Sequence, residues 1–245
     1  MNVYEQIIAK KKAGKKQLAV LVDPDKADGD DLKRLGELSM KAGVDYFFAG
    51  GSLLTTGNIF DCVKGLKENS DIPVVLFPGS VQQLTADADA VLFLSLISGR
   101  NPEMLIGHQV TAAPLVKQLN IESIATGYIL IESGNQTTVQ YISNTIPIPA
   151  DKDDIAAYTA LAGELLGMKL IFAEAGSGAL NPVSERMIER MREEISIPLI
   201  TGGGIRTPEK ALANCKAGAD LIVVGNSIEQ NKDLIRSLAD VVHGF

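Results

Sequence analysis

The chain has 245 residues, of which 46% are hydrophobic and 22% charged, and its formal net charge is −7. This length suits one α/β barrel, which takes about 250 residues, so we expect a single domain over residues 1–245. The acidic balance argues against a nucleic-acid partner, because phosphate backbones bind basic surfaces. No apolar run reaches the roughly 18 residues of a membrane span, and the N-terminus lacks a long apolar stretch. We therefore expect a cytoplasmic protein without a transmembrane segment.

Eight short apolar runs rich in branched residues recur along the chain, and each is a candidate strand. They do not alternate with polar residues, which is typical of parallel strands buried on both faces. The runs are Leu18–Val22, Val44–Ala49, Val74–Phe77, Ala90–Leu94, Ser123–Thr126, Leu170–Ala173, Pro198–Thr201 and Leu221–Val224.

Amphipathic helical patterns separate these runs. One covers Asp30–Ala42, another covers Pro182–Ile195 behind Asn181 as a possible cap, and a third begins at Thr207-Pro208 and ends at Gly218. Repeated βα units imply right-handed crossovers and a parallel sheet. Eight such units predict an α/β fold with a closed (βα)8 barrel of the triosephosphate isomerase type.

One segment departs from this pattern. Tyr128–Ile142 reads as two short extended runs around Ser133-Gly134-Asn135, which predicts a hairpin-like insert after strand five. The insert would lie on the catalytic face of a barrel, where loops carry function, so it could act as a lid.

The most informative segments are three glycine-containing turns near the C-terminus, Glu174–Gly178, Thr201–Ile205 and Val224–Ser227. Each follows an apolar run, and the last two precede helical patterns. Glycine allows close backbone approach to a ligand, and a helix start adds a positive dipole end. Three such turns at the C-terminal ends of parallel strands predict a phosphate-binding cradle.

Asp23 directly follows the first apolar run, so its carboxylate should lie at the barrel mouth near a bound phosphate. Mg²⁺ would offset the repulsion, since it takes oxygen ligands and shares them with substrate phosphates, and Ser52 could complete the site. Alternatively, Asp23 caps a turn before Pro24. Asp25 and Lys26 could form a solvated pair or contact the ligand.

Glu174 is a lone acid inside an apolar strand end, which is costly unless the acid has a role or a partner. We therefore expect a catalytic base or a group that orients a hydroxyl. The alternative is an ion pair, for which Lys169 and Arg100 are available. For Arg100, anion binding and a structural ion pair both remain open.

The two cysteines, Cys62 and Cys215, show no CxxC spacing and are expected to be buried free thiols of a reducing compartment. The histidines His108 and His243 have no neighbours with metal-ligand spacing, so we expect no zinc site.

In these residues the chain resembles the geranylgeranylglyceryl phosphate synthase family of prenyltransferases. The resemblance covers nearly the whole chain in order, and the ordered set is far more specific than any one glycine turn. The matching segments are Leu21–Lys26, Gly50–Leu53, Leu76–Ser80, Phe93–Pro102, Thr126–Leu130, Glu174–Gly178, Gly202–Pro208 and Val224–Asn226.

The resemblance implies transfer of a prenyl group, typically geranylgeranyl, from its diphosphate to the 3-hydroxyl of sn-glycerol 1-phosphate. It implies Mg²⁺ and diphosphate at Asp23 and Ser52, and Glu174 as the group that holds the attacking hydroxyl. It also implies that the glycerol phosphate lies among the substrate-binding residues Phe172, Ala173, Glu174, Ala175, Gly176, Ser177, Gly178, Gly203, Gly204, Gly225 and Asn226. Phe172 departs from the family pattern, which usually has tyrosine there.

Two other functions compete with this interpretation. A phosphosugar isomerase or aldolase barrel shares the glycine phosphate site, but an aldolase needs a Schiff-base lysine at a strand end, for which Lys26 is the nearest case. A non-catalytic phosphometabolite-binding scaffold would need neither Glu174 nor Asp23 beside its phosphates. Barrels of this kind commonly self-associate, so we also expect a homo-oligomer.

Overall fold

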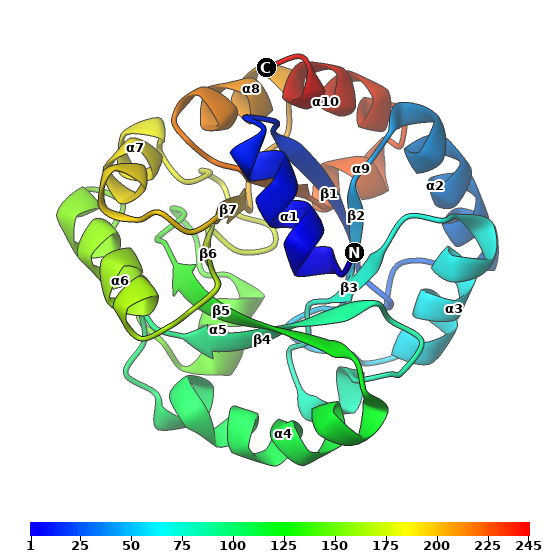
Figure 1. The fold of residues 1–245 in the computed structure, drawn as a ribbon, viewed down its shortest axis with the longest axis horizontal. Coiled ribbons are helices and arrows are strands. Elements are labelled where there is room, and N and C mark those ends of the chain that lie inside the picture. The colour runs from blue at the N-terminus through cyan, green and yellow to red at the C-terminus, as the bar shows by residue number, and fades with distance from the viewer.

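The computed structural model describes all 245 residues, and its core is a closed barrel of eight parallel strands. Every strand pairs with the next one along the chain, and β8 pairs with β1, as Leu221 opposite Gln17 shows. Figure 1 shows the strands surrounded by a ring of helices. The strands are β1 (Gln17–Val22), β2 (Tyr46–Ala49), β3 (Val74–Leu76), β4 (Ala90–Leu96), β5 (Glu122–Leu130), β6 (Leu170–Glu174), β7 (Leu199–Gly202) and β8 (Leu221–Val224).

The predicted barrel and its eight strands are thus confirmed. The helices are α1 (Val3–Lys12), α2 (Gly29–Ala42), α3 (Ile59–Asn69), α4 (His108–Leu119), α5 (Thr138–Ser143), α6 (Asp153–Leu165), α7 (Glu185–Glu194), α8 (Pro208–Lys216), α9 (Asn226–Gln230) and α10 (Leu234–His243), with a 3₁₀ turn η1 (Val81–Gln83) and a π-helical turn η2 (Glu103–Gly107). None of these helices is both long and apolar enough to cross a membrane.

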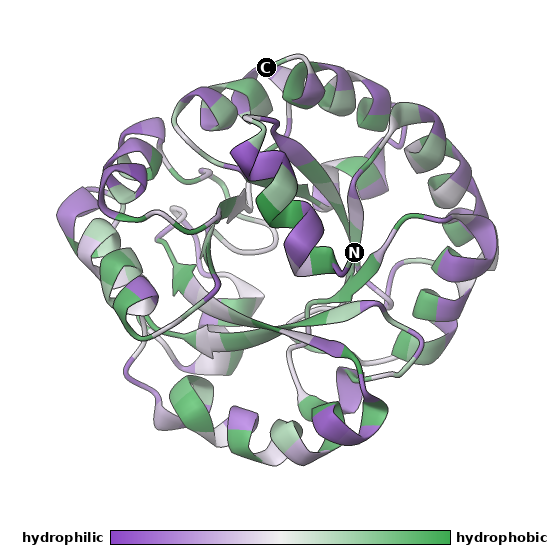
Figure 2. Cartoon of the chain, viewed as in Figure 1, coloured by the Kyte–Doolittle hydropathy of each residue, from purple (hydrophilic) through white to green (hydrophobic).

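Two apolar layers hold the barrel together. The inner layer fills the barrel with alternate strand residues such as Tyr46, Phe48 and Phe172, and the outer layer packs the other faces against the helices. This alternation follows from the two-residue period of a strand. The outer helices are amphipathic, and in Figure 2 they carry both hydrophobic and hydrophilic segments.

Helix α1 crosses the N-terminal end of the barrel, where Val3 and Ile7 join the inner layer. The carboxylate of Glu122, at the start of β5, accepts hydrogen bonds from the amides of Val3 (2.7 Å) and Tyr4 (3.1 Å). A carboxylate at a helix N-terminus satisfies unpaired amides and the helix dipole. Because α1 blocks this end, access to the interior is from the C-terminal ends of the strands.

The predicted hairpin-like insert after strand five is wrong in detail. Strand β5 continues through Tyr128 to Leu130, and a single parallel bridge then joins Ile131 to Ile148. The second extended run is instead the short helix α5. The apolar residues after Gly127 pair with β6 rather than with each other, because Leu130 lies opposite Glu174 in the register.

Two helix boundaries test the capping predictions. Helix α7 begins at Glu185 with Ser184 as its N-cap, so the expected start at Pro182 behind Asn181 is wrong. Helix α8 begins at Pro208 with Thr207 as its N-cap, as predicted. A serine hydroxyl that accepts the Met187 amide explains the later start of α7. Both cysteines are buried and unbonded, as expected.

Candidate active site

A cavity of about 300 Å³ opens among the C-terminal ends of the strands. Its polar part includes Asp23, Glu174 and Asn226, which lie at the ends of β1, β6 and β8. Its apolar part reaches into the layer between β4 and α4, where Val91 and Val116 line it. One continuous hollow therefore joins a charged region to an apolar channel.

Glu174 is the last residue of β6 and points into the barrel directly above Phe172, as the strand period requires. Its side chain is almost completely buried, with 5% of the residue exposed, and it lines the cavity. Burial raises the pKa of this carboxyl from 4.5 to about 7. Near neutral pH the group is poised to give up or accept a proton, which a general base requires.

Tyr128 is the one side chain that hydrogen-bonds to Glu174. The phenol donates to the Oε2 atom of Glu174 at 3.0 Å, across the β5–β6 pair. Burial and the neighbouring carboxylate raise the pKa of Tyr128 well above its usual value, so the phenol keeps its proton and acts as a donor. The bond also lowers the pKa of Glu174, opposing part of the burial effect. The Oε1 atom has no partner in the protein and remains for a ligand.

The alternative of an ion pair at Glu174 is not what the structure shows. The guanidinium of Arg100 donates to the carbonyl of Gly99 at 2.8 Å and has no acidic partner. The ammonium of Lys169 lies 5.1 Å from the centre of the Tyr4 ring, beside helix α1. Neither cation neutralises Glu174. The free-energy cost of burying this carboxylate is therefore not offset by an ion pair, which favours a functional role.

The three glycine turns meet in space. The amide of Ala175 donates to the carbonyl of Gly202 at 3.2 Å, which holds the first turn against the second. A Cβ atom on Gly203 would lie 2.7 Å from the amide nitrogen of Gly176, and Gly203 has a φ of +79°. Only glycine fits such a position without strain. The amides of Gly203 and Gly204 have no acceptor in the protein.

The third turn is bound to the other two by side chains. The hydroxyl of Ser177 contacts the Oδ1 atom of Asn226 at 3.0 Å. The hydroxyl of Ser227 donates to the carbonyl of Ile205 at 3.0 Å, and Arg206 donates to the carbonyl of Leu180 at 3.0 Å. The predicted cradle is therefore one connected surface built from three strand ends.

On the other side of the cavity, Asp23 and Ser52 both line the wall, as the sequence suggested. The loop after β2 runs close to the acid, because a Cβ atom on Gly51 would lie 3.5 Å from the Oδ1 atom of Asp23. Oδ1 also accepts the amide of Asp25 at 3.1 Å. Asp23 therefore caps the turn, as the alternative interpretation expected, and it lines the cavity as well. One carboxylate and one hydroxyl suit Mg²⁺ only when substrate phosphates supply further oxygens.

Asp25 and Lys26, which could form a solvated pair or contact the ligand, have different surroundings in the structure. The Asp25 carboxylate accepts the amides of Thr55 and Gly57, which lowers its pKa to about 2. Asp25 is therefore a structural residue of the β1–α2 loop, which it ties to the β2–α3 loop. The Lys26 ammonium lines the cavity, 3.0 Å from Glu229 and 3.3 Å from Asp23, and can meet an anionic ligand there.

The other residues expected at the site divide into three groups. Ser177 and Asn226 line the cavity together with Glu174. Phe172 is fully buried beneath the acid, with its ring stacked on Phe77 at 5.1 Å and edge-on to Tyr128 at 5.7 Å. The remaining expected residues contribute backbone only or face the outer layer: Ala173, Ala175, Gly176, Gly178, Gly203, Gly204 and Gly225.

Sequence reasoning missed the partner of Glu174 and the apolar channel. The sequence pattern ends the fifth strand at Thr126 and places Tyr128 in the insert, although the apolar run Tyr128–Ile131 is a signal that extends the strand. The channel wall includes His108 and Gln109 of α4, whose importance depends on how this helix packs. No local pattern in α4 indicates a cavity.

Fold and site together define the class of protein: a (βα)8-barrel enzyme with three joined glycine turns, a buried acid and an adjoining apolar channel. The chain belongs to the PcrB family, whose model matches residues 9–242. The resemblance seen in the sequence is thereby confirmed.

Named relatives agree with this assignment. The chain is 56% identical over 242 residues to the geranylgeranylglyceryl phosphate synthase of Chitinophaga pinensis, covering 99% of this chain and 96% of the relative. It is 50% identical over 235 residues to that of Spirosoma linguale, covering 96% and 94%. The solved (S)-3-O-geranylgeranylglyceryl phosphate synthase of Thermoplasma acidophilum, in complex with sn-glycerol-1-phosphate, superposes with a TM-score of 0.93 at 32% identity over the full length of both chains.

Proposed function

We propose that this chain transfers a geranylgeranyl or similar long prenyl group from its diphosphate to the 3-hydroxyl of sn-glycerol 1-phosphate, forming an ether. The observation that carries the proposal is the position of Glu174. This buried acid, which has no cationic partner, lies between a glycine cradle suited to a phosphate and a channel suited to an apolar chain. The family membership of the chain supports the same reaction.

The glycerol phosphate would bind at the three joined turns. The amides of Gly203 and Gly204, which have no acceptor in the protein, would supply N–H donors to an anion without any metal. Ser177 and Asn226, which contact each other and line the cavity, are placed to recognise the glycerol hydroxyls. With the phosphate held there, the 3-hydroxyl would reach the unpartnered Oε1 atom of Glu174.

The prenyl diphosphate would lie across the cavity, with its tail in the channel beside α4 and its head near Asp23. Asp23 and Ser52 are the residues that would hold Mg²⁺, sharing it with the diphosphate oxygens. When bound, Mg²⁺ would neutralise the negative charge of the leaving diphosphate. The Lys26 ammonium offers a second positive charge at the same wall.

The reaction exchanges one carbon–oxygen bond for another. The bond between prenyl C1 and the diphosphate oxygen breaks, and the diphosphate leaves with the electron pair. The 3-oxygen of glycerol phosphate bonds to C1 and loses its proton, which Glu174 accepts. A base with a pKa of about 7 suits this step, because it is partly ionised at neutral pH and can later release the proton.

Two general properties belong to the same proposal. We infer that the protein forms a homo-oligomer. The exposed apolar side chains of Ile155 and Tyr158 on the outer side of α6 offer a surface for self-association. Sedimentation velocity would measure the oligomeric state. The free thiols of Cys62 and Cys215 are compatible with work in a reducing cytoplasm.

The test of the proposed function is an incubation of purified protein with geranylgeranyl diphosphate, sn-glycerol 1-phosphate and Mg²⁺. We expect an ether-linked prenylglyceryl phosphate, identified by mass spectrometry, and release of diphosphate in equal amount. Glu174→Gln serves as the matched control, because the amide keeps the shape of the side chain. Diphosphate release without an ether product would contradict the proposal.

A further inference from the structure

We propose that the apolar residues around the mouth of the cavity dock this enzyme on a lipid bilayer. The candidate surface, called here the apolar rim, consists of Leu53, Ile106, Val110, Tyr141, Ile142 and Ile146, all of which are exposed. The inference rests on the proposed function, because an ether-linked prenyl product would partition into a bilayer.

The apolar rim is continuous with the cavity. Leu53 and Ile142 belong to both, because each is exposed and also lines the cavity wall. Helix α5 contacts the loop just before η2, since the side-chain amide of Asn101 donates to the carbonyl of Ser143 at 2.7 Å. Exposed side chains of η2–α4 and of the α5 region therefore lie around one opening.

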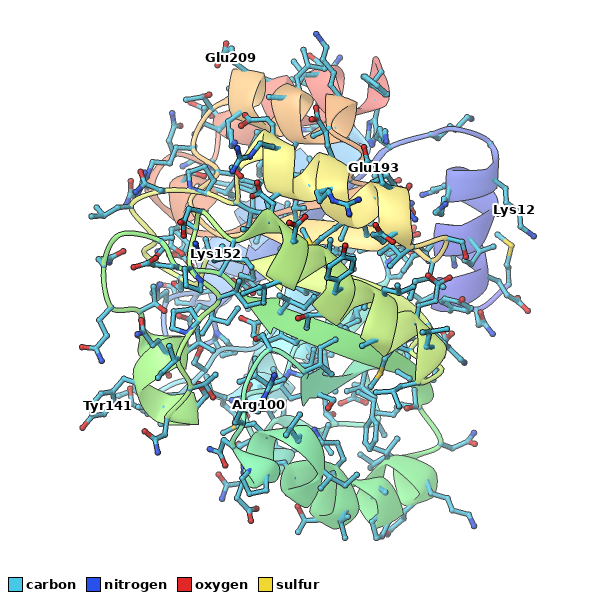
Figure 3. All side chains as sticks on the ribbon, turned by 90° about the vertical axis from the view of Figure 1, so that its left-hand side faces the viewer. Lys12, Arg100, Tyr141, Lys152, Glu193 and Glu209 are labelled. Carbon is cyan, nitrogen blue, oxygen red and sulfur yellow. The ribbon has the colours of Figure 1, made fainter.

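Large apolar side chains of the apolar rim are mostly exposed. Tyr141 is 74% exposed, Ile146 is 87% exposed, and Ile106 in η2 is 60% exposed. Figure 3 shows Tyr141 projecting outward from α5, while Arg100 lies between α5 and α4. Clustered apolar residues at the surface mark an interaction site more often than isolated ones do.

The chemistry of the product identifies the partner. A glycerol phosphate ether with a long prenyl chain is an amphiphile, whose tail would have to cross water to leave a cavity that opened onto solvent. Each buried methylene contributes about 0.8 kcal/mol, so a direct path from channel to bilayer avoids a large cost. Leu53 and Ile142 place the apolar rim at the opening of the cavity, which is where such a path must begin.

Charge indicates which bilayers suit this surface. The formal net charge of the chain is −7, and Glu103, next to the cavity-lining Met104 in η2, is exposed. An anionic bilayer would repel such a protein. Docking should therefore depend on apolar contact and be insensitive to salt, unlike the attachment of a polybasic segment.

The test is flotation of the full-length protein with phosphatidylcholine vesicles at 50 and 500 mM salt. The test variant is the triple substitution Ile106→Ser, Tyr141→Ser and Ile146→Ser, none of which lines the cavity. The matched control is Leu165→Ser with Leu166→Ser, equally exposed at the C-terminal end of α6, on the opposite side of the barrel from the cavity. We expect at least a fivefold loss of vesicle-bound protein in the triple variant and no loss in the control, at both salt concentrations.

Transfer of the prenyl group in solution is measured on the same preparations, using a short and freely soluble prenyl diphosphate. We expect the triple variant to retain the wild-type rate. Absence of transfer with intact vesicle binding would refute the proposed reaction and support docking. Failure of the wild type to float, or binding restricted to anionic vesicles at low salt, would overturn the docking proposal. Sedimentation velocity that shows the triple variant dissociating, with its vesicle binding unchanged, would assign the surface to a second copy of the chain and overturn it as well.

Discussion

Replacing Glu174 by glutamine should stabilise the protein at alkaline pH while it inactivates the enzyme. Burial raises the pKa of this carboxyl from 4.5 to about 7, so the folded chain holds the protonated form more tightly than the unfolded chain does. Each pKa unit corresponds to 1.36 kcal/mol, and the ionised side chain therefore costs the folded state about 3 kcal/mol. Glutamine carries no charge, and its carbonyl can still accept the hydrogen bond from Tyr128.

The sign of this effect gives it a characteristic pH dependence. Below pH 4.5 the carboxyl is protonated in both states and carries no penalty. The penalty grows as the pH rises above 4.5 and is complete above about 7. The free energy of unfolding of Glu174→Gln should exceed that of the wild type by about 1 kcal/mol at pH 5 and about 3 kcal/mol at pH 8.

The assay is a pair of thermal melts at pH 5 and pH 8, followed by prenyl transfer on the same preparation. About 3 kcal/mol corresponds to a rise in Tm of roughly 5–10 °C for a chain of this size. Turnover should fall by about 10²–10⁴-fold, because the amide cannot accept the proton. The exposed Glu189 provides the control, since Glu189→Gln should change neither property. A Tm difference that is equal at both pH values, or absent, would refute the reasoning about Glu174.

Three further predictions concern the neighbours of this acid. Tyr128→Phe removes a hydrogen bond that lowers the pKa of Glu174, so the acid limb of the pH–rate profile should move to higher pH; an unmoved limb would argue against the pairing. Asp23→Asn should lower turnover and weaken the response to Mg²⁺ in titrations, whereas Asp25→Asn should mainly lower the Tm, because Asp25 binds loop amides. Calorimetry with a chelator present should still detect glycerol phosphate binding at the metal-free cradle, and complete loss of heat would mean that a metal bridges both substrates.

Much of the fold could be predicted from the sequence because barrel strands are buried on both faces. Uninterrupted apolar runs such as Leu221–Val224 are then enough to locate them, and that strand has the predicted bounds. The prediction failed after Gly127, where the same kind of run continues β5 to Leu130. Whether such a run pairs with a neighbouring strand or turns back is decided by tertiary contacts, here the register with β6.

The residues of the candidate site also differ in whether the sequence could predict them. Residues placed by a strand end were found from the sequence, because the C-terminal ends of parallel strands meet at one face; Asp23, Ser52 and Glu174 all line the cavity there. Tyr128 contacts Glu174 from 46 positions away, and that pairing depends on the β5–β6 register. The expected contact of Phe172 with substrate stays a prediction, and its position in the aromatic cluster beneath Glu174 places its ring away from the cavity wall.

The most direct test of the central claim compares the two enantiomers of the acceptor under identical conditions. The protein would be given geranylgeranyl diphosphate with either sn-glycerol 1-phosphate or sn-glycerol 3-phosphate, and kcat/KM would be measured for each. A cradle that fixes the phosphate relative to the buried Glu174 presents the free primary hydroxyl of only one enantiomer correctly, so we predict strong preference for sn-glycerol 1-phosphate. Equal rates with both enantiomers, or no transfer with either, would contradict the account.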